Sequence, residues 1–148
     1  MGLDMYIEGR IYFWTDEDEE NKKTISSLFK GLKDFETKEV IFRLGYWRKA
    51  NAIHKWFVDN IQDENDDCED YYVELNKLIK LKSLCQKVIE NKDLAEELLP
   101  TQSGFFFGGT EYDEYYFDDL KNTIDIINKI IKLTEENNNV DLYYRSSW

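Results

Sequence analysis

The residues best suited to chemistry fall in two short stretches of the chain. The first, YWRKANAIH, ends at the only histidine, His54, and also contains Trp47, Arg48 and Asn51. An arginine can bind phosphate through two parallel hydrogen bonds, and a tryptophan ring can stack on a base. The amide and a neutral imidazole can each donate to and accept from a base edge or a ribose hydroxyl. This set of side chains suits a nucleotide-like ligand.

The second stretch, PTQSGFFFGGTEYDEYY, covers residues 100–116. Its three glycines bracket three phenylalanines, which predicts a flexible loop held against the core by aromatic rings. Binding residues concentrate in such loops, where glycines also allow backbone amides to approach a ligand. We therefore predict ligand contacts from Gln102, Ser103, Glu111, Tyr112 and Tyr116.

Both stretches also have a purely structural interpretation. His54 lies on the apolar side of the helix expected there, where a histidine is often buried and hydrogen-bonded to a neighbour. The phenylalanines of the second stretch are equally consistent with a loop that only packs on the core. The sequence leaves both interpretations open.

The motifs of common catalytic and cofactor sites are absent from the sequence. No Gly-Lys-Ser/Thr completes a P-loop, and Ser103 lies outside a G-x-S-x-G frame. A single histidine leaves little scope for a catalytic triad. We therefore expect no catalytic residues and no cofactor, while an enzyme acting on a nucleotide stays open as an alternative.

An acidic segment matches part of a calcium-binding pattern. Positions 1, 3, 5 and 12 of an EF-hand count fall on Asp63, Asn65, Asp67 and Glu74. Position 6, which requires glycine for a sharp turn, is Cys68, and this mismatch favours a solvated loop over a metal site. The two cysteines form no CxxC pair, so a structural zinc site is not expected either.

The chain is strongly acidic. Its 148 residues carry 19 lysines and arginines against 31 aspartates and glutamates, a net charge of −12. This charge disfavours direct binding to nucleic acid or to an anionic membrane. It permits high solubility, or docking on a basic host protein through the acidic segments 16–20 and 63–70. The N-terminus has no secretory signal, and we expect a cytoplasmic protein without a membrane span.

The hydrophobic pattern predicts one α+β domain over residues 1–148. Alternation favours strands at 3–14, 38–47 and 140–148, and a period near 3.6 favours helices at 46–61, 75–89 and 117–139. We expect a small antiparallel sheet, formed by both chain ends and residues 38–47, that packs against about three helices. A shorter amphipathic helix is expected at 24–35.

Several motifs resemble a family of small uncharacterised proteins encoded by phages and prophages. The similar segments are MGLDMY, YWRKANAIHKWF, DDCEDYYV, LLPTQSGFFFGGTEYDEYYF and YYRSSW, whereas the charged segment 15–37 is not covered. The resemblance implies an accessory protein in a bacterial host cell, of the kind that often acts in counter-defence. It implies no catalytic residues.

The main hypothesis is noncatalytic binding of a nucleotide-like small molecule between the helix 46–61 and the loop 101–116. Trp47, Tyr112 or Tyr116 would stack on the base, and Arg48 would bind phosphate. Hydrogen bonds to the remaining polar edges would come from Asn51, His54, Gln102 and Glu111. Because such aromatic clefts often form at dimer boundaries, a homodimer is also expected. The alternatives are an acidic inhibitor of a basic host protein and an enzyme acting on a nucleotide.

Overall fold

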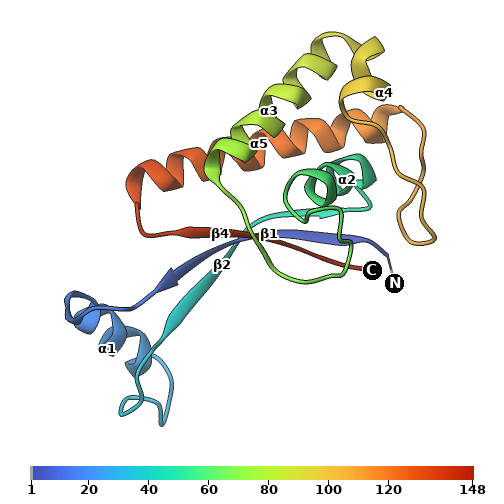
Figure 1. Cartoon of the computed structure of the whole chain (residues 1–148). Coiled ribbons are helices and arrows are strands. Elements are labelled where there is room, and N and C mark those ends of the chain that lie inside the picture. The colour runs from blue at the N-terminus through green and yellow to red at the C-terminus, as the bar shows by residue number, and fades with distance from the viewer. Residues whose placement is uncertain (1) are drawn as a thin grey trace.

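A computed structural model describes residues 2–148 as a four-stranded antiparallel sheet with helices on one face (Figure 1). The sheet order is β2-β1-β4-β3, formed by β1 (Asp4–Tyr12), β2 (Glu39–Arg48), β3 (Tyr71–Tyr72) and β4 (Asp141–Ser147). The helices are α1 (Glu19–Ser27), α2 (Asn51–Asn60), α3 (Leu75–Glu90), α4 (Ala95–Leu98) and α5 (Glu114–Glu136). This is the predicted α+β fold, with both chain ends in the sheet.

Strand β1 lies at the centre because its side chains alternate between two environments. Met5 and Ile7 are fully buried against the helices, whereas Tyr6 and Glu8 lie on the opposite, uncovered face. The strand pairs with β2 along one edge and with β4 along the other, and Ile7 lies opposite Tyr144 of β4. The first and last strands of the chain are therefore neighbours.

Two long amphipathic helices, α3 and α5, pack on each other and supply much of the core. Leu81 and Cys85 of α3 and Leu120 and Ile127 of α5 are buried at the spacing expected for one helical face. Burial raises the pKa of the Cys85 thiol to about 12, which keeps the thiol neutral. The prediction that Cys85 is a core residue is confirmed. Within residues 2–148, none of the helices combines the length and apolar character that a membrane span requires.

The main difference from the sequence prediction lies at residues 46–50. The apolar spacing predicted that a helix begins at residue 46, but β2 continues to Arg48 and α2 begins at Asn51. Lys49 separates them in a left-handed conformation with a φ of 58°. Trp47 is buried as a strand residue rather than a helix residue, because every second side chain of this part of β2 faces the core. The predicted helix at 24–35 is also displaced, since α1 ends at Ser27.

Gly45 offers a test of how closely β2 packs on α5. A Cβ at this position would lie 2.5 Å from Cγ2 of Ile126 and 2.9 Å from Cγ2 of Ile7, which is closer than side chains normally approach. We expect Gly45→Ala to lower the free energy of unfolding by about 1–3 kcal/mol, measured by urea denaturation. Gly109→Ala is the control, because a Cβ there meets nothing within 4 Å. Equal losses in the two variants would contradict the packing described here.

Candidate functional site

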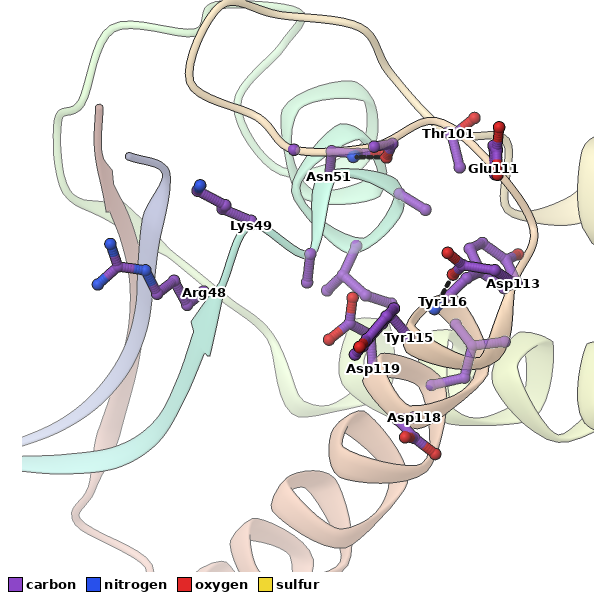
Figure 2. A pocket seen from close by; sticks show the side chains of 16 residues that line it. Arg48, Lys49, Asn51, Thr101, Glu111, Asp113, Tyr115, Tyr116, Asp118 and Asp119 are labelled. Carbon is purple, nitrogen blue, oxygen red and sulfur yellow. Dashed lines mark hydrogen bonds between the residues drawn. The ribbon is translucent and has the colours of Figure 1, made fainter. Parts of the chain in front are cut away.

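A cavity of about 340 Å³ lies between the first turn of α2, the loop after Pro100 and the first turns of α5 (Figure 2). We call it the α2–α5 cleft. Its volume falls in the range of small-molecule sites, about 300–1,000 Å³. Four of the nine predicted site residues line it: Arg48, Asn51, Glu111 and Tyr116. The other five lie outside it: Trp47, His54, Gln102, Ser103 and Tyr112. The binding role of all nine stays a prediction.

Asn51 fastens the loop to α2. Its side-chain amide donates to the carbonyls of Phe107 at 3.0 Å and Gly109 at 2.8 Å, and its Oδ1 accepts from the N–H of Gln102 at 2.9 Å. The residue is buried, so the loop backbone already uses its side-chain hydrogen bonds. Asn51 therefore shapes one wall of the cleft instead of offering polar atoms to a ligand.

His54 lies in the core, in agreement with the structural interpretation left open above. Nδ1 lies 2.7 Å from the hydroxyl of Tyr144, and Nε2 lies 3.0 Å from a carboxylate oxygen of Asp66. Both contacts are hydrogen bonds when Tyr144 donates to Nδ1 and the Nε2 hydrogen is donated to Asp66. The other Asp66 oxygen accepts from the indole of Trp148 at 3.0 Å. His54 thus links α2 to β4 and to the acidic loop.

Trp47 and Tyr116 also have structural roles. The Trp47 indole donates to Thr123 of α5 at 2.9 Å, and the Tyr116 hydroxyl donates to the carbonyl of Leu99 at 2.8 Å. Both side chains are buried, and neither presents a free ring face to a base. Tyr112 packs edge-on against Tyr116, with ring centroids 4.9 Å apart, and its hydroxyl accepts from the N–H of Thr101.

The remaining predicted residues lie at the margins of the cleft. Figure 2 shows the Arg48 side chain extending toward β1, away from Tyr115 and Asp119. Arg48 is the register partner of Asp4, so its guanidinium belongs to the uncovered face of the sheet. Gln102 contributes its backbone N–H to Asn51, and Ser103 is exposed to solvent. Glu111 lines the cleft, and its contact with a ligand stays a prediction.

The sequence interpretation missed two residues near the centre of the cleft, Tyr115 and Asp119. Both extend from the first turns of α5 toward α2 (Figure 2), and Tyr115 is 80% exposed. They were missed because the helix was expected to begin at residue 117. It begins at Glu114, capped by the Asp113 carboxylate, which accepts from the N–H of Tyr116 at 3.1 Å. With that start, the i,i+4 spacing of Tyr115 and Asp119 places them on one helical face.

The Asp119 carboxyl lacks a cationic partner. No ion pair joins it to a lysine, an arginine or His54 within residues 2–148. Its pKa is raised to about 7, first by partial burial and then by the nearby charges of Asp118 and Asp113. Near neutral pH this carboxyl can therefore donate or accept a hydrogen bond, and a donor group placed beside it would favour the ionised form.

The opposite wall of the cleft is the amino terminus of α2. The N–H groups of Asn51 and His54 are bonded to the carbonyls of Lys49 and Ala50, and no side chain of residues 2–148 caps the helix. Within residues 2–148 the N–H groups of Ala52 and Ile53 have no hydrogen-bond partner, and both residues line the cleft but are largely shielded from solvent, with exposed fractions of 6% and 0%. Unpaired N–H groups at a helix start favour negatively charged groups. The amino end of α2 therefore suits acceptor groups of a ligand, and the Asp119 side of the cleft suits its donor groups.

The acidic loop is occupied by internal contacts. Asp66 binds His54 and Trp148, Asp67 accepts from the hydroxyl of Tyr71 at 2.7 Å, and Asp70 pairs with Arg10. Cys68 adopts a left-handed conformation, with a φ of 61°, at the position where an EF-hand has glycine. Between residues 2 and 148, no group of three or more histidine, cysteine, aspartate and glutamate side chains is arranged to hold a metal ion.

Comparison of the chain with protein-family models, with curated protein sequences and with solved structures gave no match. The chemistry of the cleft is therefore the main indication of function.

The clamp formed by Asn51 can be tested directly. We expect Asn51→Ala to lower the free energy of unfolding by about 2–3 kcal/mol, because two carbonyls and one N–H of the loop lose their partners. Hydrogen exchange should accelerate at Gln102, whose N–H bonds to the missing oxygen. Asn128→Ala on the exposed side of α5 is the control. Unchanged exchange in the loop would show that Asn51 does not hold it.

The raised pKa of Asp119 predicts that the stability of the protein depends on pH. An unfolded aspartate loses its proton near pH 4, whereas folded Asp119 keeps it until about pH 7. The folded state thus binds more protons in this window, and the contribution of Asp119 to stability falls as pH rises from about 4 to about 7. We expect Asp119→Asn to raise the stability at pH 8 by about 1 kcal/mol, allowing for solvent screening, with almost no gain at pH 4.

Thermal unfolding at both pH values measures this effect. Asp125→Asn, on the exposed side of the same helix, is expected to change the melting temperature equally at the two pH values. A gain in Asp119→Asn that does not depend on pH would contradict the raised pKa.

Proposed function

We propose that the protein binds a nucleotide-like small molecule in the α2–α5 cleft without transforming it. The observation that carries the proposal is the arrangement of two chemically different walls across one cavity of suitable size. One wall is the amino end of α2, where the N–H groups of Ala52 and Ile53 have no partner within residues 2–148 and lie mostly below the surface, and the other presents Tyr115 and Asp119. A nucleotide has the matching parts, since it joins an anionic phosphate to an aromatic base that carries N–H donors.

In the proposed complex, each part of the ligand has a distinct contact. The phosphate lies at the amino end of α2, where the helix dipole favours negative charge. The base stacks on the exposed ring of Tyr115. Its amino group donates to Asp119, which then becomes ionised because a hydrogen bond to the charged form lowers its pKa.

This assignment changes the residues expected to make contacts. Tyr115 replaces Trp47, Tyr112 and Tyr116 as the residue proposed to stack on the base. The rings of those three residues are packed or hydrogen-bonded within the protein. The amino end of α2 replaces Arg48 as the proposed phosphate contact. Asn51 and His54 support the cleft from behind, and Glu111 keeps its proposed role as a polar contact at the rim.

The resemblance to phage-encoded proteins suggests a biological role for such binding. A protein that holds a nucleotide without turnover can lower the free concentration of a signal, and we propose this kind of counter-defence. Docking on a basic host protein has less support as an alternative, because carboxylates of the segment 63–70 form bonds inside the protein. An enzyme acting on a nucleotide would use the same cleft and differs in the fate of the ligand.

A thermal-shift panel of linear nucleotides, cyclic nucleotides and NAD tests the proposal. A ligand at 100 times its dissociation constant stabilises the folded state by about 2.7 kcal/mol, which raises the melting temperature by several degrees. We expect Tyr115→Ala and Asp119→Asn to remove the shift, and Tyr72→Ala and Asp125→Asn to keep it, because the last two residues lie away from the cleft.

The ligand's fate separates binding from catalysis. Recovery of the intact nucleotide after long incubation supports sequestration, whereas a chemically changed product supports the enzyme. The absence of a shift with every nucleotide would refute the proposed function.

A further inference from the structure

The segment between β1 and β2 forms an arm, which we define as residues 13–38. It contains α1 and a run of turns, and it lies at the end of the β1–β2 hairpin that is remote from α2 and α3 (Figure 1). The arm takes no part in the α2–α5 cleft, so the inference drawn from it is independent of the proposed function.

The arm and the adjoining end of β2 expose many large apolar side chains. Trp14 is 82% exposed, Leu28 73% and Phe35 67%, and Phe29, Leu32, Ile41 and Phe42 are also exposed. Leu28, Phe29 and Phe42 line a groove of about 470 Å³ whose apolar lining also includes Ile25 and Val40, whereas Ile41 points to the opposite face of β2. Exposed apolar groups concentrated in this way are typical of protein interfaces.

Local hydrogen bonds hold these apolar side chains in place. The Ser26 hydroxyl donates to the carbonyl of Phe35 at 2.9 Å, and Lys22 pairs with Glu36 at 3.2 Å. Successive turns join Phe29 to Ser26 and Leu32 to Phe29. The exposed surface is therefore formed before any partner binds, which lowers the entropic cost of association.

Several charges of both signs on the arm have no ion-pair partner within residues 2–148. Residues 16–20 are all acidic, whereas residues 21–33 contain four lysines and no acidic residue. Within residues 2–148, Lys23, Lys30 and Lys33 form no ion pair, and Asp16, Glu17 and Glu20 form none either. The arm as a whole carries seven carboxylates and five lysines, so only −2 of the net charge of −12 lies on it.

We propose that the partner of the arm is the arm of a second copy of this chain, packed antiparallel across a two-fold axis. This arrangement brings the acidic segment 16–20 of one copy to Lys30 and Lys33 of the other, twice. The turn that carries Leu32 and Phe35 covers the partner's groove. A second copy fits because one surface offers both halves of the charge pattern, as an isologous interface requires. The strongly acidic bodies stay apart because the arms project away from them.

Sedimentation velocity at concentrations between about 1 and about 200 µM tests the proposal, since this range brackets dimers of micromolar affinity. We expect the wild-type chain to dimerise and the double variant Leu28→Asp, Phe29→Asp to sediment as a monomer throughout. Ile79→Asp on α3 is the matched control, because Ile79 is 46% exposed and lies away from the arm. It is expected to leave the dimer intact. Circular dichroism should show unchanged folding in all three proteins.

A charge swap tests whether the partner of the arm is the arm of a second copy of the chain. Lys30→Glu with Lys33→Glu should weaken the dimer at least tenfold, and mixing this variant with an Asp16→Lys, Glu17→Lys variant should restore mixed dimers. A wild-type chain that is monomeric up to about 200 µM would overturn the proposal. A dimer that survives the substitutions at Leu28 and Phe29, or a charge reversal that the complementary variant does not rescue, would also overturn it.

Discussion

The buried contact between Tyr144 and α2 is the constraint on which the rest of the molecule depends. The Tyr144 ring stacks on Phe57 with centroids 3.8 Å apart and an interplanar angle of 4°, and its hydroxyl bonds to His54. This contact sets the position of α2 on the sheet. The position of α2 places Asn51, and Asn51 holds the loop that closes one side of the cleft. A core interaction between the last strand and one helix thus determines the geometry of a surface site.

Side-chain periodicity predicted the long elements well, because each of them buries one continuous face. The strands at both chain ends and helices α3 and α5 follow this rule. It was misleading at Trp47, which is buried in a strand but happens to stand at helical spacing from Ala50 and His54. Lys49, in its left-handed conformation, separates the two-residue period of β2 from the 3.6-residue period of α2. The sequence gives no signal for that turn, because lysine is not typical of the left-handed conformation.

The site prediction identified the two segments that form the cleft, yet several of the side chains named within them are already hydrogen-bonded or packed inside the protein. The residue type shows which hydrogen bonds a side chain can form, but not whether a neighbouring residue already forms them.

The uncovered face of the sheet shows how the chain uses its cations. All four arginines lie in β1, β2 and β4, on the face opposite the helices. The Arg10 guanidinium lies 4.2 Å from the centre of the Tyr143 ring and pairs with Glu8 and Asp70, and these hydrogen bonds raise its pKa despite the opposing effect of burial. Arg43 lies over the Tyr6 ring. A register shift between Ile7 and Glu8 keeps Arg43 and Tyr46 on this same face. Arginine supports the sheet here because its planar group can stack and pair at once, whereas the exposed lysines mainly interact with solvent.

The central position of β4 has a consequence for the order in which the protein folds. The hairpin of β1 and β2 can form early in synthesis, but the second edge of β1 waits for a strand from the other end of the chain. Until β4 emerges from the ribosome, β1 presents unpaired backbone groups, and the apolar surfaces of α2, α3 and α5 lack the strand that joins them. Closing the sheet requires contacts between residues separated by almost the whole sequence, which slows folding. The nascent chain therefore passes through a stage in which an open strand edge is exposed to aggregation or to chaperones.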